Sequence, residues 1–256
     1  HAGNFYPKEF LKYKSIDIKK LKKMEDYKTD TFINNIDLNL ADFFIAKCSR
    51  VVVDLNRSRK SLDCSMFESK LETIPIEEIL LIKSGLGVLP SKCYSEKIFK
   101  SKLPNFYISK MLERYYDPFH KKLSERINYL KSKFGIVYLI DIHSTPTIPN
   151  NEKNFPNIII GDNFGKSSEE HFKNYLISHF KRLDLKYSIN SPYSGGYITK
   201  KYGEKDKSVN VIQIEISKNY YMNETTFELK TNLNTIKNMF KNIVEKLNIK
   251  NSIAAQ

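Results

Sequence analysis

The sequence predicts an α/β fold in which helices cover both faces of a mixed, largely parallel β-sheet. Three short apolar runs, at residues 50–55, 136–142 and 210–217, each end in polar side chains, as buried strands of such a sheet do. Between these runs, apolar residues recur at helical spacing. No Gly/Ser-rich linker or internal repeat divides the 256 residues, so we expect one domain over residues 1–256.

The first half of the chain predicts two helices, each leading into a strand. A helix is expected over residues 30–47, ahead of a strand over 50–55. A longer amphipathic helix is expected over residues 108–134, with an interruption near Asp117-Pro118 because proline lacks an N–H donor. It leads into the strand over residues 136–142.

The second half of the chain predicts two strands, two helices and one glycine-containing loop. Residues 157–161 form a short apolar run, and a helix is expected from about Ser167 to Leu183 with a capped start. After the strand over residues 210–217, a C-terminal helix is expected over 225–249. The loop from Asn190 to Thr199 contains paired glycines, which permit either close approach to a ligand or a simple tight turn.

Composition narrows the possible partners. The net charge of +13 favours an anionic substrate, but the lysines are scattered without a basic arm, so nucleic acid is not the expected partner. No apolar run reaches the roughly 18 residues of a membrane span. The three cysteines lack C-x-x-C spacing, which argues against disulfides and a thiolate zinc site and favours the cytoplasm. The oligomeric state is not predicted.

The polar residues at the strand ends are candidates for metal-assisted hydrolysis. His143 is a candidate imidazole ligand or a structural histidine, and Asp141 would point to the same side of the strand to orient it. Glu215 lies between two isoleucines, which we expect to raise its pKa as a general base requires, although it could pair with Arg57 instead. Arg57 offers a planar fork for a substrate carboxylate or a polarised carbonyl, and Asn56 adds a neutral donor.

Several short motifs follow one another along most of the chain. They are His1-Ala2-Gly3, Thr29 to Phe32, Val53-Asp54-Leu55-Asn56-Arg57, Tyr115 to His120, Asp141-Ile142-His143-Ser144, Gly161 to Gly165, Asn190 to Thr199 and Gln213 to Ile216. This ordered set resembles the N-formylglutamate amidohydrolase family. The resemblance implies a fold similar to zinc carboxypeptidases and aspartoacylases, with the metal at the carboxyl edge of the sheet. Because the chain opens on the motif histidine, we expect the family's first strand to be lacking.

The resemblance also implies roles for individual residues. His1 and His143 would bind Zn²⁺, and Glu215 would activate water. Aspartoacylase-like relatives use H-x-x-E, but this chain has Asn4 at that position, so Asp30 is the substitute ligand.

Glu25 and Asp26 are the alternatives for this acidic ligand. Asn56 and Arg57 would bind the substrate, together with the loop residues Tyr193, Gly195, Gly196 and Tyr197.

The function implied by the resemblance is zinc-dependent hydrolysis of a small N-acyl amino acid, N-formyl-L-glutamate, to formate and L-glutamate. Two alternatives stay open. One is a related amidase that acts on another N-acyl amino acid or a peptide. The other is a metal-free anion-binding protein with the same fold.

Overall fold

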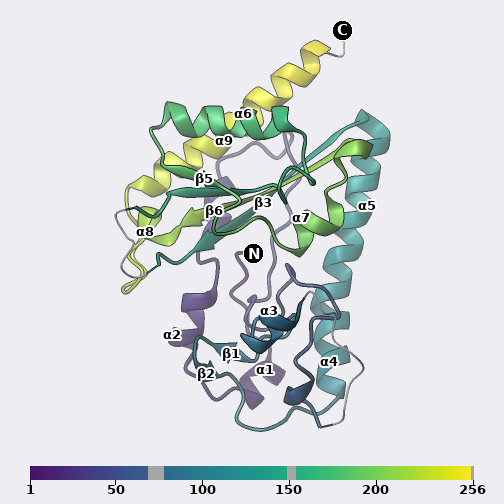
Figure 1. Ribbon diagram of the computed structural model, residues 1–256, viewed down its shortest axis with the longest axis vertical. Helices are drawn as coiled ribbons and strands as arrows, with labels where there is room; N and C mark the ends of the chain where they lie inside the picture. The colour runs from purple at the N-terminus through teal and green to yellow at the C-terminus, as the bar shows by residue number, and fades with distance from the viewer. Residues whose placement is uncertain (69–77, 149–153, 255–256) are drawn as a thin grey trace. The chain divides into compact units, whose positions relative to one another are not determined.

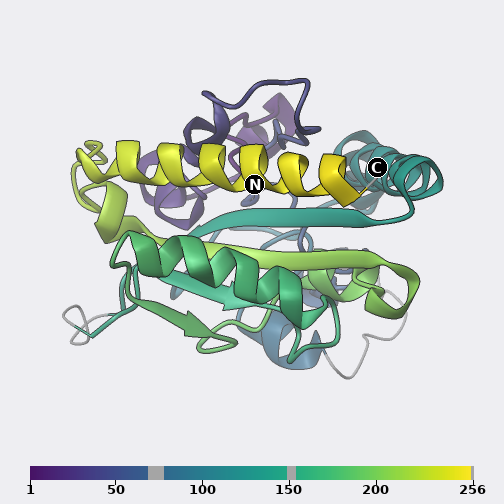
Figure 2. The ribbon, with the colours of Figure 1, turned by 90° about the horizontal axis from the view of Figure 1, so that it is seen from above.

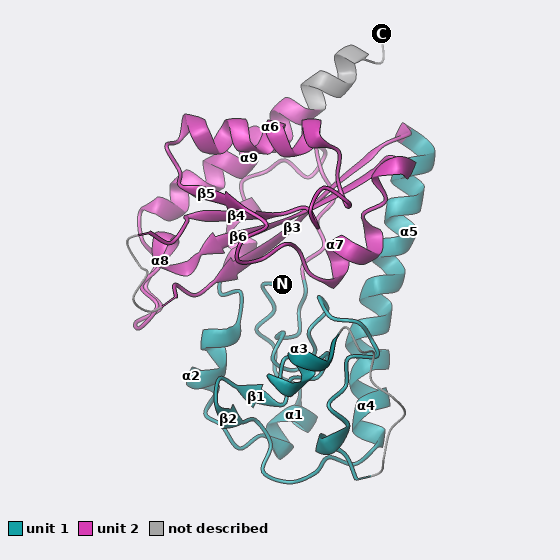
Figure 3. Cartoon of the chain, viewed as in Figure 1, with its two compact units in different colours: residues 1–27, 46–133 teal, residues 28–45, 134–256 magenta. Residues whose placement is uncertain are grey.

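A computed structural model describes residues 1–68, 78–148 and 154–254, with side chains described up to residue 247. The chain divides into two compact units (Figure 3). Unit 1 contains His1–Tyr27 and Ala46–Lys133, and unit 2 contains Lys28–Ile45 and Phe134–Gln256. Each unit is therefore assembled from two separate stretches of sequence.

Unit 1 consists mainly of short helices and turns (Figure 1). Its aromatic core includes Phe10, Phe99 and Tyr107, whose rings make edge contacts at centroid distances of 5.6 and 6.1 Å. The elements are α1 (Lys8–Tyr13), α2 (Ile18–Leu21), η1 (Lys22–Met24), η3 (Cys64–Met66), α3 (Ile79–Lys83), β1 (Lys92–Cys93), β2 (Glu96–Lys97), α4 (Phe106–Met111), the π-helical turn η5 (Leu112–Tyr116) and α5 (Asp117–Phe134).

The strand predicted over residues 50–55 is wrong, because this segment is a series of turns. The backbone N–H groups of Val52 and Val53 donate to the carbonyl of Ser49, over 2.9 and 3.2 Å. All three consecutive valines are at most 2% exposed. A buried β-branched run satisfies the sequence pattern of a buried strand even where its backbone hydrogen bonds are local.

The long helix predicted over residues 108–134 is confirmed, together with its interruption. Helix α4 passes into the π-helical turn η5, and regular α-helical geometry resumes in α5 at Asp117. The N–H of Asp117 donates to the carbonyl of Leu112 within this turn, and Pro118, which has no N–H, follows directly.

The helix predicted over residues 30–47 is wrong beyond its first turn, which lies in unit 2. Only the 3₁₀-helix η2 (Thr29–Ile33) forms. Phe32 is fully buried and packs edge-on against Tyr221 at a centroid distance of 4.9 Å, which accounts for the apolar signal. Farther on, the carboxylate of Asp37 accepts the N–H of Asn39 at 2.9 Å, and such local side-chain bonds compete with a helix.

The core of unit 2 is a mixed sheet of four strands, which confirms the predicted α/β class. The strands are β3 (Val137–Thr145), β4 (Ile158–Gly161), β5 (Tyr187–Ile189) and β6 (Val209–Ser217), in the spatial order β3-β6-β4-β5. The pairs β3/β6 and β4/β5 are parallel, and β4/β6 is antiparallel. Three of these strands match predicted ones, whereas β5 was not predicted.

The remaining elements of unit 2 are α6 (Glu170–Arg182), α7 (Tyr197–Tyr202), η6 (Lys205–Lys207), α8 (Lys218–Tyr221) and α9 (Asn232–Ala254). Helices α6 and α9 run side by side (Figures 1 and 2), and the hydroxyl of Tyr175 donates to the carbonyl of Ile243 at 2.6 Å. In the described parts of the chain, no helix combines the length and apolar character needed to cross a membrane.

The start of α6 is capped from the sheet and not by its own serines. The N–H of Glu169 donates to Oδ1 of Asn210 at 2.7 Å, and the hydroxyl of Ser167 donates to the carbonyl of Val211 at 2.8 Å. The preceding residues therefore bind β6, and the helix begins later than predicted.

The contacts of α6 distinguish the two faces of the sheet. Tyr138 of β3 packs on Phe172 of α6 at a centroid distance of 4.6 Å, and Asn210 of β6 bonds to the start of the same helix. Successive residues of a strand point to opposite faces. The even-numbered residues of β3 and β6 thus face α6, and the odd-numbered residues face the other way.

Candidate active site

Four polar side chains share the face of the sheet that points away from α6. In the parallel register of β3 and β6, Asp141 lies opposite Gln213, and His143 lies opposite Glu215. All four are buried, with exposed fractions between 0 and 9%. Burying polar groups costs free energy unless they are hydrogen-bonded or bind something. This face is therefore the strongest candidate for chemistry in unit 2.

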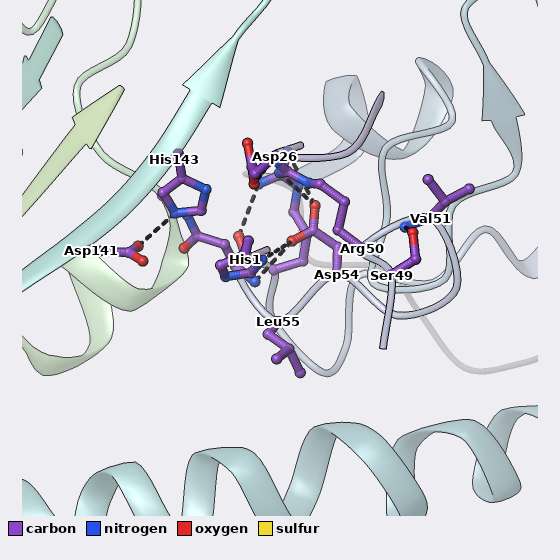
Figure 4. Close-up of polar contacts among 12 residues, drawn as sticks. His1, Asp26, Ser49, Arg50, Val51, Asp54, Leu55, Asp141 and His143 are labelled. Carbon is purple, nitrogen blue, oxygen red and sulfur yellow. Dashed lines mark hydrogen bonds and ion pairs between the residues drawn. The ribbon is translucent and has the colours of Figure 1, made fainter. Parts of the chain in front are cut away.

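Asp141 and His143 form a close pair at this site. Oδ2 of Asp141 lies 2.9 Å from Nε2 of His143 (Figure 4). Despite this distance, Oδ2 is a buried oxygen without a hydrogen-bond partner among the described residues. A buried oxygen and an imidazole nitrogen placed together in this way fit the donor types that zinc prefers. Asp141, which the sequence suggested only as an orienting partner, is thus also a candidate ligand.

Glu215 of β6 has His143 of β3 opposite it and receives a hydrogen bond from Gln213. Its Oε1 accepts a hydrogen bond of 2.8 Å from Nε2 of Gln213. The isoleucines on either side of it, Ile214 and Ile216, face the opposite side of the sheet because of the two-residue repeat of a strand. The expectation that these isoleucines surround the carboxylate was therefore wrong.

The glycine loop contacts Gln213, one of these four residues. Gly195 has a φ of +111°, which favours glycine. The N–H of Gly196 donates to Oε1 of Gln213 at 2.7 Å, and Tyr197 begins helix α7. The hydroxyl of Thr145 donates to the hydroxyl of Tyr193 at 3.2 Å. All four loop residues predicted to bind substrate thus belong to a segment that is anchored to the sheet.

Gln213 is the residue of this site that the sequence reasoning missed. The sequence did contain a signal for Gln213, because residues two positions apart on a strand share a face and Gln213 lies two positions before Glu215. The same spacing relates Asp141 to His143.

In unit 1, Arg57 is held by backbone carbonyl groups. Its Nε donates to the carbonyl of Leu86 at 2.9 Å, and Nη1 donates to that of Asn56 at 2.8 Å. The hydroxyl of Tyr116, in the π-helical turn, donates to the carbonyl of Arg57 at 2.8 Å. The neighbouring Asn56 is 2% exposed, and its N–H donates to Asp54. The guanidinium group is therefore oriented before any ligand binds.

A buried charge network lies next to Arg57. Arg50 donates to Asp26 at 2.8 Å and to Asp54 at 2.9 Å (Figure 4). Burial by itself would raise the pKa of Asp54, but the guanidinium groups of Arg50 and Arg57 outweigh it and lower that pKa. Nδ1 of His1 lies 3.8 Å from Oδ1 of the same carboxylate.

Asp30, the acidic ligand proposed from the resemblance, is more exposed to solvent than the alternatives Glu25 and Asp26. Asp30 is exposed on η2 in unit 2. Asp26 and Glu25 are buried in unit 1, where Asp26 binds Arg50. Glu25 accepts hydrogen bonds from Ser49, at 2.8 Å, and from Tyr6. Both alternatives thus have protein partners of their own.

Curated relatives of this chain are bacterial. An N-formylglutamate deformylase from Pseudomonas putida is 27% identical over 191 residues, which are 72% of this chain and 66% of that protein. A second, from Pseudomonas aeruginosa, is 28% identical over 116 residues, 44% of each. The chain spans less than two thirds of the length of these relatives.

Solved structures share the fold. A crystal structure of N-formylglutamate amidohydrolase from Ralstonia eutropha JMP134 matches 96% of this chain and 90% of that one, with a TM-score of 0.82 and 22% identity. A gene product of Agrobacterium tumefaciens matches 78% of this chain and 66% of its own, with a TM-score of 0.52 and 20% identity. The model of one family, described as N-formylglutamate amidohydrolase, matches residues 1–222. The chain therefore belongs to the N-formylglutamate amidohydrolase family.

Proposed function

We propose that this protein hydrolyses N-formyl-L-glutamate to formate and L-glutamate with the help of a bound zinc ion. The observation that carries the proposal is the register of β3 and β6, which puts the buried carboxylate of Glu215 opposite His143 on one face of the sheet. Membership of the family supports the choice of substrate.

The donor set on the sheet fits zinc. His143 and Asp141 offer a nitrogen and an oxygen 2.9 Å apart, and Oδ2 of Asp141 has no hydrogen bond within the described chain. The resemblance adds His1 and, as an acidic ligand, Asp30. When bound, zinc would polarise the acyl carbonyl and acidify a water molecule.

Glu215 would act as the base. Its carboxylate would accept a proton from the attacking water and pass it to the nitrogen of the departing glutamate, while the water oxygen ends in formate. The hydrogen bond from Nε2 of Gln213 to Oε1 would hold this carboxylate in place during the transfer. This assignment requires Glu215 to be ionised before water attacks.

The other predicted residues would bind the substrate. Arg57 would contact a substrate carboxylate through its planar fork, with Asn56 as a neutral donor. Tyr193, Gly195, Gly196 and Tyr197 would border the acyl amino acid. A substrate with two carboxylates suits a chain with a net charge of +13.

The test is formate release from N-formyl-L-glutamate by zinc-loaded protein, compared with N-acetyl-L-glutamate, N-formyl-L-glutamine and a formylated peptide. We expect N-formyl-L-glutamate to have the highest kcat/KM. Preference for another substrate would favour a related amidase, and no turnover with any of them would favour an anion-binding protein.

The role of Glu215 has its own test. Glu215→Gln should keep zinc and lose about 10²- to 10⁴-fold in kcat, the range of general base catalysis. The control is Glu228→Gln, on an exposed residue of the same unit. A lower melting temperature with normal kcat would show that Glu215 is structural and would contradict the proposal.

A further inference from the structure

We propose that Gln213 is a positioning residue that couples the Gly195-Gly196 loop to Glu215. The argument rests on two hydrogen bonds made by opposite ends of one side-chain amide. The catalytic role of Glu215 belongs to the proposed function, but the coupling itself is a property of unit 2 and is testable without turnover.

The amide of Gln213 has only one orientation that satisfies both neighbours. Its Oε1 accepts the N–H of Gly196 at 2.7 Å, and its Nε2 donates to Oε1 of Glu215 at 2.8 Å. Rotating the amide by half a turn would place an NH₂ group against the N–H and an oxygen against the carboxylate. Both contacts would then be repulsive. The loop and the carboxylate therefore fix the same amide.

The backbone beneath Gln213 is rigid. Strand β6 is paired on both sides, with Asp141 of β3 opposite Gln213 on one side and Gly161 of β4 opposite it on the other. The side chain itself is 5% exposed. With its Cα held in the centre of the sheet, the amide has little freedom to follow a displaced partner.

Gly161 allows the loop to lie directly on the sheet at this point. A Cβ added at Gly161 would lie 2.5 Å from the backbone nitrogen of Gly195, closer than real Cβ contacts come. The loop is also held by a hydrogen bond, because the N–H of Asn163 donates to the carbonyl of Ser194 at 2.7 Å. The contact between Gly196 and Gln213 thus belongs to a closely packed arrangement.

The consequence is that the position of the loop determines the position of the base. A free glutamate side chain has several rotamers, and restricting them has an entropic cost that the Gln213 bond offsets before the reaction. If the loop moves off Gly161, Oε1 of Gln213 loses its partner and the amide is free to turn. Substrate contacts that displace the loop would then change the position of the Glu215 carboxylate.

The experiment separates the two ends of the amide. Gln213→Met keeps the length of the side chain and removes both hydrogen bonds. Gln213→Glu keeps an acceptor for Gly196 but places a carboxylate against Glu215. The control is Asn210→Ala, on the same strand but facing α6. For each variant we would measure the melting temperature, the exchange rate of the Gly196 amide by NMR, and kcat and KM on N-formyl-L-glutamate.

We expect Gln213→Met to accelerate Gly196 exchange at least about tenfold and to lower kcat by about 10- to 100-fold, as misplacement of a catalytic group does. Gln213→Glu should retain slow Gly196 exchange and still lose kcat. Asn210→Ala should lower the melting temperature and leave Gly196 exchange and kcat within about twofold. If Gln213→Met does not fold, the exchange rate of Gly196 in Glu215→Ala decides the coupling in its place.

One arm is independent of catalysis. Glu215→Ala removes the second partner of the amide and should accelerate Gly196 exchange by several-fold, whereas Glu228→Ala should not. Unchanged exchange in Glu215→Ala, or normal kcat in Gln213→Met, would overturn the coupling. Absence of turnover by the unmodified protein, with the exchange results as expected, would instead refute the proposed function and keep the coupling.

Discussion

Arg57 differs from its neighbour Arg59 in how its guanidinium group is held. Arg57 is bound by the carbonyls of Leu86 and Asn56, with its side chain 17% exposed, whereas Arg59 makes a surface ion pair with Asp117 and is 50% exposed. A planar fork oriented in this way suits a carboxylate, and lysine keeps the charge but loses the geometry. Exposed ion pairs contribute little to stability.

Arg57→Lys should therefore lower kcat/KM for N-formyl-L-glutamate by about 10- to 100-fold, because the variant loses one charge-assisted hydrogen bond to the substrate. Arg59→Lys should change it by less than about twofold. Steady-state kinetics and a thermal melt on both variants check this. Equal kcat/KM in the two would remove Arg57 from substrate binding.

Zinc content distinguishes the candidate acidic ligands. His143→Ala and Asp141→Asn should each lose zinc, because each removes a donor atom of the pair on β3 and leaves too few ligands for a stable site. Elemental analysis after dialysis measures the metal per chain. Full zinc content in both variants would contradict a site on this face. The same loss in Asp30→Asn would identify Asp30 as a ligand, as the resemblance implies.

At the scale of elements, the buried carboxylate of Asp162, just after β4, helps to attach the loop that follows β5. Asp162 accepts hydrogen bonds from Asn190 at 2.7 Å, from Lys173 at 3.0 Å and from the N–H of Gly165 at 2.9 Å. Burial raises the pKa of Asp162, but the hydrogen bonds from Asn190 and Lys173 outweigh it and hold the pKa below its ordinary value of 3.8.

A lowered folded-state pKa means that the unfolded chain binds the proton more readily. The stabilisation from Asp162 is therefore complete at a pH above the pKa that Asp162 has in the unfolded chain. It is lost as the pH falls through the pKa that Asp162 has in the folded protein. Asp162→Asn should lower the melting temperature near pH 7, and the difference should shrink as the pH is taken below about 3.8. Thermal melts across this range check it, with the exposed Asp206→Asn as control. A difference independent of pH would contradict this role.

At the scale of the whole molecule, neither unit is a continuous piece of chain. The sequence passes between units at residues 27–28, 45–46 and 133–134, the last of these within helix α5. Each unit contains one segment that continues at both ends into the other unit, so unfolding of either unit frees both ends of a segment of its neighbour. We therefore expect the single domain predicted from the sequence to unfold in one transition. Calorimetry should give a ratio of calorimetric to van't Hoff enthalpy of about one. Two resolved transitions would show two independent domains.

The sequence alone was sufficient for the α/β class, for β3, β4 and β6, and for placing Asp141 and His143 on the same face of one strand. These features depend on local periodicity, since residues two apart on a strand always face the same way. The long helix and its interruption before Pro118 were predictable for the same reason, because the spacing of apolar residues and the missing N–H of proline are properties of the chain itself.

Other features required the tertiary structure. The register that puts His143 opposite Glu215 is a relation between strands more than 60 residues apart, which no local pattern specifies. The apolar run at residues 51–53 predicts a strand, but the structure has turns there. The burial of a segment does not determine which groups its backbone hydrogen bonds join. The hydrogen bond from Gly196 to Gln213 depends on a loop that packs closely against Gly161, and this packing joins parts of the chain that are far apart in sequence.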